Sequence, residues 1–408
     1  MNGSGTGSCK YEEAAIHCSV TVNNTYDHDA HHFYLLGFSA MNNNVIRILI
    51  VDGKLITGGV EAFIMNIYRH IDRSRFQFDF LVHYKEAFFY DEEVKRLGGK
   101  IHYLTFRNDN NIIKYIHDLK VFFREHHEYK IVWGQMDGLA GIYLRIAKEE
   151  GIPVTIMHSH VTSVEKNLKG AIKNLIHRKI PAYADYRFAC STEAGKYLYG
   201  DSSFSIIHNA VETEKYKYDE DARIRIRSAN NWNGCHVVGH VGRFFQEKNH
   251  RYIIDFFEQL TKMSDKYRLC LCGEGEELDG IRQIVRERGL TDKVLFTGGI
   301  KNVNEYYQAF DAFVLPSLYE GLPVSGVEAQ TSGLICFFSD RITEEVSLVP
   351  ENVEFLSIND APEIWAQHIN SRIQYERKDQ SGAIINQGYD IHTLVLYLEK
   401  LFTELQVK

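Results

Sequence analysis

The sequence contains no run of 18 apolar residues, so it predicts no membrane-spanning helix. It has no excess of basic residues either, because its formal net charge is -8. A protein that binds nucleic acid through bulk charge needs a basic surface, so this class is excluded and any anionic ligand must be bound locally. Cysteine is scarce: the seven residues are scattered and odd in number, which indicates reduced thiols and a cytoplasmic protein rather than a disulfide framework.

The length of the chain exceeds what a single hydrophobic core supports. With 408 residues, of which 44% are hydrophobic and 25% charged, the sequence predicts a globular protein of two domains. Residues 1–44 show no sustained apolar pattern and no signal peptide, so we expect a disordered or non-native N-terminal extension. Met41 is followed by three asparagines and then by the first strand, and it is the expected start of the working protein.

Apolar runs alternate with helical periodicity through both halves of the chain. Such alternation predicts parallel sheets with helices on both faces. In the first half the expected strands are Val45–Val51, Phe78–Val82, Ile101–Leu104, Ile131–Trp133 and Val154–Met157. In the second half they are His236–Val241, Arg268–Cys272, Val294–Phe296 and Ala312–Leu315. A charge-dense segment between the halves, residues 213–234, is the expected linker.

A glycine-rich turn follows the first strand and opens a helix at Gly58 and Gly59. Glycine lets the backbone approach an anion and the helix end attracts it, so the turn is a candidate phosphate site. The turn lacks the spacing of a dinucleotide-binding Rossmann turn and of a P-loop, so neither is predicted.

A histidine, His158, directly follows the strand Val154–Met157. Ligand groups in open α/β sheets gather at the carboxyl ends of the strands, which makes His158 a candidate site residue. A structural histidine is the alternative interpretation. His160, two residues later, leaves the choice between the two histidines open.

Residues 164–180 carry five lysines and arginines beside one apolar stripe. This pattern is typical of a basic amphipathic helix that contacts anionic lipid. An ordinary half-buried helix fits the same pattern, so both interpretations stay open.

Charged residues in the second half follow two expected strands. Arg243 and Lys248 bracket a turn between a strand and a helix, where they could clamp a diphosphate. Glu320 and Glu328 flank a Gly-Leu-Pro turn that begins another helix. Backbone N–H groups at such a helix start can hold an anion while the carboxylates bind sugar hydroxyls. The alternative is that Glu320 merely begins a turn and that Glu328 is a solvated helix residue.

These motifs, taken in order with Asn209, resemble the retaining GT-B glycosyltransferases of family 4, also called glycosyltransferase group 1. Two motifs are similar to those of the branch that builds bacterial exopolysaccharide, capsule or O-antigen: Glu247-Lys248-Asn249 and Glu320-Gly321-Leu322-Pro323-Val324. The resemblance covers about residues 45–390. It implies an α/β fold of the GT-B type, with two Rossmann-like domains facing across a cleft.

The resemblance also implies a role for each site residue. His158, Arg243, Lys248 and Glu320 are the expected catalytic residues; the expected substrate-binding residues are Gly58, Gly59, Asn209, Gly321, Leu322, Pro323, Val324 and Glu328. The two basic side chains would neutralise the departing diphosphate, and His158 and Glu320 would contact the donor sugar. Glu328 would accept hydrogen bonds from the ribose. The loops 273–275 and 297–299 would frame the base, and Asn209 would line the cleft at the hinge.

The resemblance implies a nucleotide-diphosphate-sugar donor, for which we expect UDP, and a saccharide or lipid-linked acceptor. No metal and no other cofactor is expected, because basic side chains and helix ends replace the metal. A catalytically silent GT-B protein that assists a polysaccharide assembly is an alternative. A nicotinamide oxidoreductase is a third hypothesis, and the missing fingerprint glycines oppose it.

The resemblance and the composition together predict the division of the chain. The expected parts are an extension over 1–44, an acceptor-side domain over 45–212, the linker 213–234, a nucleotide-sugar domain over 235–390, and a C-terminal helix over 391–408 that packs toward the first domain. The expected location is the cytoplasm, with residues 164–180 contacting the inner face of the plasma membrane.

Ser325 and Gly326 depart from the apolar residues usual between the two glutamates, and glycine weakens a helix interior by about 1 kcal/mol.

Overall fold

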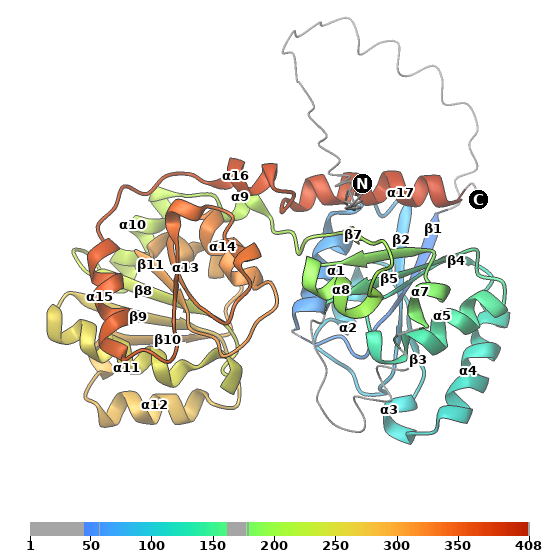
Figure 1. Ribbon diagram of the computed structural model, residues 1–408, viewed down its shortest axis with the longest axis horizontal. Helices are drawn as coiled ribbons and strands as arrows, with labels where there is room; N and C mark the ends of the chain where they lie inside the picture. The colour runs from blue at the N-terminus through green and yellow to red at the C-terminus, as the bar shows by residue number, and fades with distance from the viewer. Residues whose placement is uncertain (1–44, 57, 161–176, 178, 407–408) are drawn as a thin grey trace, which may run out of the picture. The chain divides into compact units, whose positions relative to one another are not determined.

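The computed structural model describes residues 45–56, 58–160, 177 and 179–406 (Figure 1). The expected extension over 1–44 and nearly all of the basic segment 164–180 therefore lie outside the described residues. No helix in the described ranges combines the length and the apolar character needed to cross a membrane.

The first half of the described chain forms a seven-stranded parallel sheet in the order β3-β2-β1-β4-β5-β6-β7. Its strands are β1 (Ile46–Val51), β2 (Phe76–Val82), β3 (Ile101–Tyr103), β4 (Tyr129–Gly134), β5 (Val154–Ser159), β6 (Tyr186–Ala189) and β7 (Ser205–Ile206). The helices are α1 (Gly59–His70), α2 (Asp91–Arg96), α3 (Phe106–Asp109), α4 (Ile112–Glu125), α5 (Ala140–Glu149), α7 (Ile180–Tyr183) and α8 (Thr192–Tyr199).

Strand β1 shows why this sheet has helices on both faces. Successive side chains of a strand point to opposite faces, and β1 is apolar at almost every position. Ile48 and Ile50 belong to a core that includes residues of α1, whereas Leu49 and Val51 belong to a core that includes residues of α4 and α5. Each face therefore buries its own layer of helices.

The second half forms a six-stranded parallel sheet in the order β10-β9-β8-β11-β12-β13. Its strands are β8 (His236–Val241), β9 (Tyr267–Cys272), β10 (Val294–Gly298), β11 (Ala312–Leu315), β12 (Ile335–Ser339) and β13 (Val353–Leu356). The helices are α9 (Thr213–Tyr216), α10 (Glu220–Ala229), α11 (His250–Met263), α12 (Leu278–Glu287), α13 (Val303–Ala309), α14 (Val324–Thr331), α15 (Pro362–Arg372), α16 (Ser381–Asn386) and α17 (Ile391–Gln406). Strands β8 and β11 are neighbours, so the loops after them lie at the same edge. The expected α/β fold class is confirmed.

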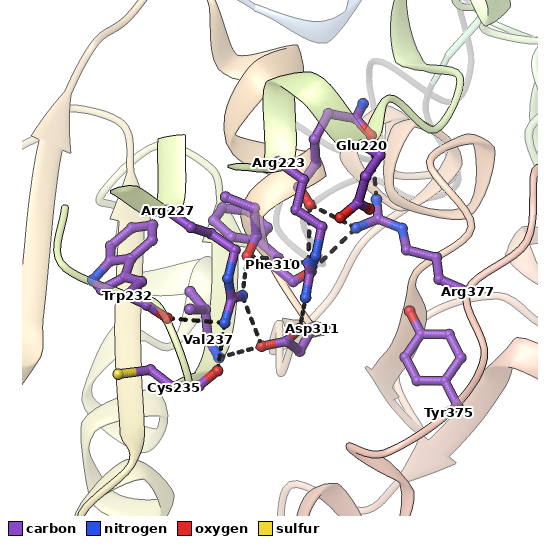
Figure 2. Close-up of polar contacts among 12 residues, drawn as sticks. Glu220, Arg223, Arg227, Trp232, Cys235, Val237, Phe310, Asp311, Tyr375 and Arg377 are labelled. Carbon is purple, nitrogen blue, oxygen red and sulfur yellow. Dashed lines mark hydrogen bonds and ion pairs between the residues drawn. The ribbon is translucent and has the colours of Figure 1, made fainter. Parts of the chain in front are cut away.

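The segment 213–234, which the sequence predicts as a linker, contains α9 and α10. Helix α10 packs against α13, and its Arg227 is buried. The Arg227 guanidinium lies 3.1 Å from the carboxylate of Asp311, which also accepts a hydrogen bond from the backbone of Val237 at 2.7 Å (Figure 2). Part of the charge of α10 is thus buried and paired inside the fold, which sequence periodicity does not indicate.

The last helix, α17, shares its core with the first half of the chain. Ile391, Leu398 and Phe402 belong to the same hydrophobic core as β1 and α1, and α17 contacts α1 directly. The backbone of Asp390 pairs with that of Val211 immediately before the helix begins. The chain therefore returns, after the second sheet, to elements of the first half.

Candidate functional site

The loops after β8 and β11 bring together charged residues that are about 70 positions apart in the sequence. The backbone N–H of Leu318 donates to the Glu247 carbonyl at 2.8 Å, and the Asn249 side chain donates to the Pro316 carbonyl at 3.2 Å. These bonds hold the turn that carries Lys248 against the loop that carries Glu320.

Lys248 and Glu320 form an ion pair in this structure. Their side chains are 17% and 16% exposed, so water screens the pair less than it would on an open surface. The Ser317 hydroxyl also donates to Glu320, at 3.0 Å. The lysine predicted to bind the diphosphate is therefore paired with the carboxylate predicted to bind the donor sugar.

Arg243, at the other end of the same turn, is exposed. Its guanidinium lies 4.6 Å from the centre of the Phe245 ring, a favourable cation–π distance. Among the residues that the structure describes, Arg243 makes no ion pair within 4.0 Å. Its charge is thus available to an anionic ligand, whereas that of Lys248 must first be released.

The start of α14 is open to a ligand. Pro323 is the N-cap residue and no described side chain caps the helix. The Gly326 N–H donates to the Pro323 carbonyl at 3.0 Å, whereas the N–H groups of Val324 and Ser325 have no hydrogen-bond partner among the described residues. Gly321 has open space on its Cα, whereas Leu322 packs into a core with Val211. This arrangement leaves the Gly-Leu-Pro turn and the backbone of Val324 positioned for an anion.

Gly326 explains how α14 accommodates a glycine. A Cβ at this position would lie 3.1 Å from the Phe338 ring and 3.2 Å from Val346, closer than ordinary packing allows. The residue is buried, and α14 begins at Val324 in spite of it. The missing side chain lets Phe338 and Val346 pack closely against α14 at this position, in spite of the low helix propensity of glycine.

Glu328 lies on α14 next to a cavity of about 150 Å³. The cavity is lined by Ala62, Phe63, Asn66, Arg69, Asn209, Ala210, Val211, Glu212, Lys215, Tyr216, Val324 and Glu328. The Asn209 side-chain oxygen is buried and has no hydrogen-bond partner in the described part of the chain. Three predicted binding residues, Asn209, Val324 and Glu328, therefore meet at one hollow with polar groups that a ligand could satisfy.

The glycine-rich turn after β1 has the Glu61 carboxylate against Gly58 and open space beside Gly59. A Cβ at Gly58 would collide with the Glu61 carboxylate, whereas a Cβ at Gly59 would meet nothing. Burial raises the pKa of Glu61, and the positive charges of Arg243 and Lys54 oppose this shift. A phosphate could approach Gly59, but the space at Gly58 is occupied by the side chain of Glu61.

Asp52, at the end of β1, forms an acid pair with Glu61. Only 7% of Asp52 is exposed, and burial together with the Glu61 charge raises the pKa of its carboxyl from 3.8 to about 8. The Gly53 backbone donates to it at 2.6 Å and opposes the shift. Asp52 therefore holds a proton at neutral pH, which lowers the negative charge of the turn.

We expect Asp52→Asn to make stability less dependent on pH. The folded protein holds this proton up to about pH 8, whereas the unfolded chain releases it near pH 4, so the wild-type free energy of unfolding falls as the pH rises between these values. The variant keeps an acceptor oxygen for Gly53. Its free energy of unfolding relative to wild type should rise by about 3 kcal/mol when the pH is raised from 5 to 8. Urea unfolding at both pH values measures this gain. The exposed Asp292→Asn is the control, and equal pH dependence of Asp52→Asn and wild type would contradict the assignment.

His158 lies on the core side of β5 with 0% of its surface exposed. Its ring stacks on Trp133 at 6.1 Å and meets the edge of Phe63 at 5.1 Å. Burial, and then the neighbouring His160, lower its pKa well below 6.5, so it is neutral. His160 is only partly buried, and its Nε2 lies 2.8 Å from the side-chain oxygen of Gln135. The proposed contact between His158 and a sugar stays a prediction, and His160 is the more accessible of the two.

The sequence-based reasoning missed several residues of this region. Asp52 and the Glu61 carboxylate carried no signal beyond their position beside the glycine turn. Tyr307, which binds Glu328, lies in an unremarkable helix. The loops expected to frame a base do adjoin the Arg243 turn, because the Phe244 backbone donates to Glu274 at 2.8 Å and the Gly299 backbone donates to the Glu274 side chain at 3.1 Å.

Comparisons with known proteins identify the family of this chain. A putative glycosyltransferase, EpsF from Bacillus subtilis, is 32% identical over 379 residues, which cover 86% of this chain and 98% of EpsF. Residues 223–391 match the family model described as glycosyl transferases group 1. The chain belongs to the group 1 glycosyltransferases. The family therefore accounts for the two parallel sheets and for a role in sugar transfer.

Two further proteins extend the comparison. CapH of Staphylococcus aureus, named a capsular polysaccharide biosynthesis glycosyltransferase, is 21% identical over 88% of this chain and 99% of its own. The crystal structure of Anabaena Alr3699/HepE in complex with UDP has a TM-score of 0.71 at 17% identity, covering 88% of this chain and 100% of HepE. Likeness at this identity shows the fold, which is the GT-B fold of the glycosyltransferases.

Proposed function

We propose that this glycosyltransferase transfers a sugar from a UDP-sugar to a saccharide or lipid-linked acceptor in the synthesis of bacterial surface polysaccharide. The name of EpsF supports sugar transfer, the name of CapH supports the pathway class, and the UDP bound to HepE supports the donor. The observation that carries the proposal is the meeting of Lys248 and Glu320 beside the uncapped start of α14. Cations and free N–H groups suit a diphosphate, and carboxylates suit sugar hydroxyls.

The chemistry follows from these groups. The bond between the anomeric carbon and the diphosphate oxygen breaks, UDP leaves with both electrons, and the acceptor oxygen forms the new bond and loses its proton to the departing phosphate. Arg243 and Lys248 act on the charge that develops on the leaving group. We propose retention of configuration, by attack on the face that the diphosphate leaves, as in family 4. The proposal includes no metal, because the two cations take over its electrostatic role.

Contact with the cytoplasmic face of an anionic membrane through residues 164–180 stays part of the proposal. Co-sedimentation with liposomes that contain or lack anionic lipid tests it, and binding that ignores lipid charge would reject it.

The decisive experiment is a thermal-shift screen with UDP-, GDP- and ADP-sugars. A ligand that binds only the folded state raises the melting temperature, and we expect UDP-sugars to do so at concentrations where the others have little effect. Release of UDP by the purified protein then separates an enzyme from a silent assembly partner. A screen in which no nucleotide-sugar shifts the melting temperature would remove the proposal.

A further inference from the structure

Two tyrosine hydroxyls hold the carboxylate of Glu328. The Tyr307 hydroxyl donates to Glu328 Oε2 at 2.8 Å, and the hydroxyl of Tyr216 also hydrogen-bonds to the carboxylate. Both tyrosines are buried: Tyr307 lies on α13, and Tyr216 is the last residue of α9. Burial raises the pKa of Glu328, and these two hydroxyl groups oppose the shift by stabilising the ionised form.

The two hydroxyls fix the orientation of the Glu328 carboxylate and therefore the direction of its remaining lone pairs. An ionised carboxylate accepts about four hydrogen bonds, so two donors from the protein leave capacity for a ligand. Glu328 lines the cavity of about 150 Å³ described above, together with Tyr216 and Val324. A carboxylate presented with a fixed orientation can accept two neighbouring hydroxyl groups at once, as a ribose diol requires.

The backbone of Tyr307 is itself anchored by arginines. Arg377 donates to the carbonyl of Tyr307 at 3.0 Å and to that of Gln308 at 2.8 Å. Arg223 donates to the carbonyl of Phe310 at 2.8 Å, as Figure 2 shows. These carbonyls lie at the end of α13, where helical partners are missing. The arginines thus cap the helix that presents the Tyr307 hydroxyl.

Tyr216 is anchored in a similar way. Its carbonyl accepts from the Ser332 hydroxyl at 2.7 Å and from the Gln308 side chain at 3.3 Å. Ser332 directly follows α14, the helix that carries Glu328. Helices α9, α13 and α14 are therefore linked by polar contacts around a single carboxylate.

We propose that Tyr307 and Tyr216 are positioning residues that set recognition of the nucleotide ribose by orienting Glu328, with Arg377 holding Tyr307 in place. This inference rests on the proposed function, because it takes Glu328 as the ribose-binding group. It adds that the selectivity for a ribose diol depends on two buried hydroxyl groups. The Tyr307 hydroxyl acts through Glu328 and does not touch the ligand itself.

The test compares the affinities of UDP and 2′,3′-dideoxy-UDP by calorimetry on the full-length protein. Tyr307→Phe keeps the ring and removes one hydrogen bond to a charged group, so we expect UDP affinity to fall about tenfold while dideoxy-UDP affinity stays unchanged. Tyr306→Phe, the same change at the neighbouring position of α13, is the control and should leave both affinities unchanged. Tyr216→Phe provides a second variant with the same expected loss of selectivity.

The outcomes separate two kinds of failure. Equal loss for both nucleotides would indicate a merely structural role and overturn the inference, as would unchanged UDP affinity in Tyr307→Phe and Tyr216→Phe. In both cases UDP binding by wild type would leave the proposed function intact. Failure of wild type to bind UDP would overturn the proposed donor and the inference together. Melting curves of each variant verify that the fold survives.

Discussion

Lys248→Ala is expected to lower kcat/KM for sugar transfer by about 10³, a loss typical of removing a group that stabilises charge in the transition state. Lys248 lies where the turn after β8 meets the loop after β11, which leads to the uncapped start of α14. The diphosphate gains charge as the glycosidic bond breaks, so the effect of a nearby cation is greatest in the transition state. The measurement is steady-state release of UDP from a UDP-sugar with and without acceptor.

Matched variants make this prediction specific. Lys262→Ala removes an exposed lysine from α11, the helix that follows the Lys248 turn, and should retain wild-type activity. Lys248→Arg keeps the charge with another geometry and should lie between wild type and Lys248→Ala. The alanine variant leaves Glu320 without its ion-pair partner, so its melting temperature must be recorded alongside. Activity within about threefold of wild type in a folded Lys248→Ala protein would rule out this role.

Glu320→Gln is expected to change catalysis and nucleotide affinity in opposite directions. Sugar transfer should fall by about 10², because a carboxylate proposed to bind the donor sugar is neutralised. The affinity for UDP, which carries no sugar, should rise about threefold, because Lys248 no longer has to leave an ion pair to reach the phosphates. Glutamine keeps an oxygen that can accept from the Ser317 hydroxyl, so the loop should keep its conformation.

Calorimetry with UDP and the transfer assay together test this pair of effects. Glu344→Gln, an exposed position in the second half of the chain, is the control and should change neither quantity. Weaker UDP binding by Glu320→Gln would show that the ion pair helps to form the nucleotide site instead of competing with it. Unchanged transfer would remove Glu320 from the catalytic residues.

The sequence predicted the repeating strands well for a simple reason. Strands buried on both faces read as nearly continuous apolar runs, and β1 and β11 are of this kind. The α/β class and the order of the motifs followed from these runs. Strands β6, β7, β12 and β13 and helix α10 were not predicted: β12, for example, follows α14 after only a short turn, and α10 lies in the charge-dense segment expected as a linker.

The resemblance to a family identified most of the candidate site, since Arg243, Lys248, Glu320 and Glu328 could be named from motif and spacing. Their pairing could not be predicted. Lys248 can bind a phosphate or Glu320, and only the closeness of the loops after β8 and β11 shows which contact this structure makes. The burial of His158 depends on rings from α1 and β4, which no local pattern reveals.

The sequence by itself determined the fold class, the strand ends at which ligand groups gather, and the charged residues placed there, because these depend on local periodicity and short motifs. The tertiary structure decided which of these groups are paired, buried or free. It alone joined Tyr216 and Tyr307 to Glu328, because residues on different helices acquire such partners only when the helices pack, and it alone showed that Asp52 is buried beside Glu61. Hydrogen bonds and pKa shifts arise from that packing, and so does the reach of each side chain toward a ligand.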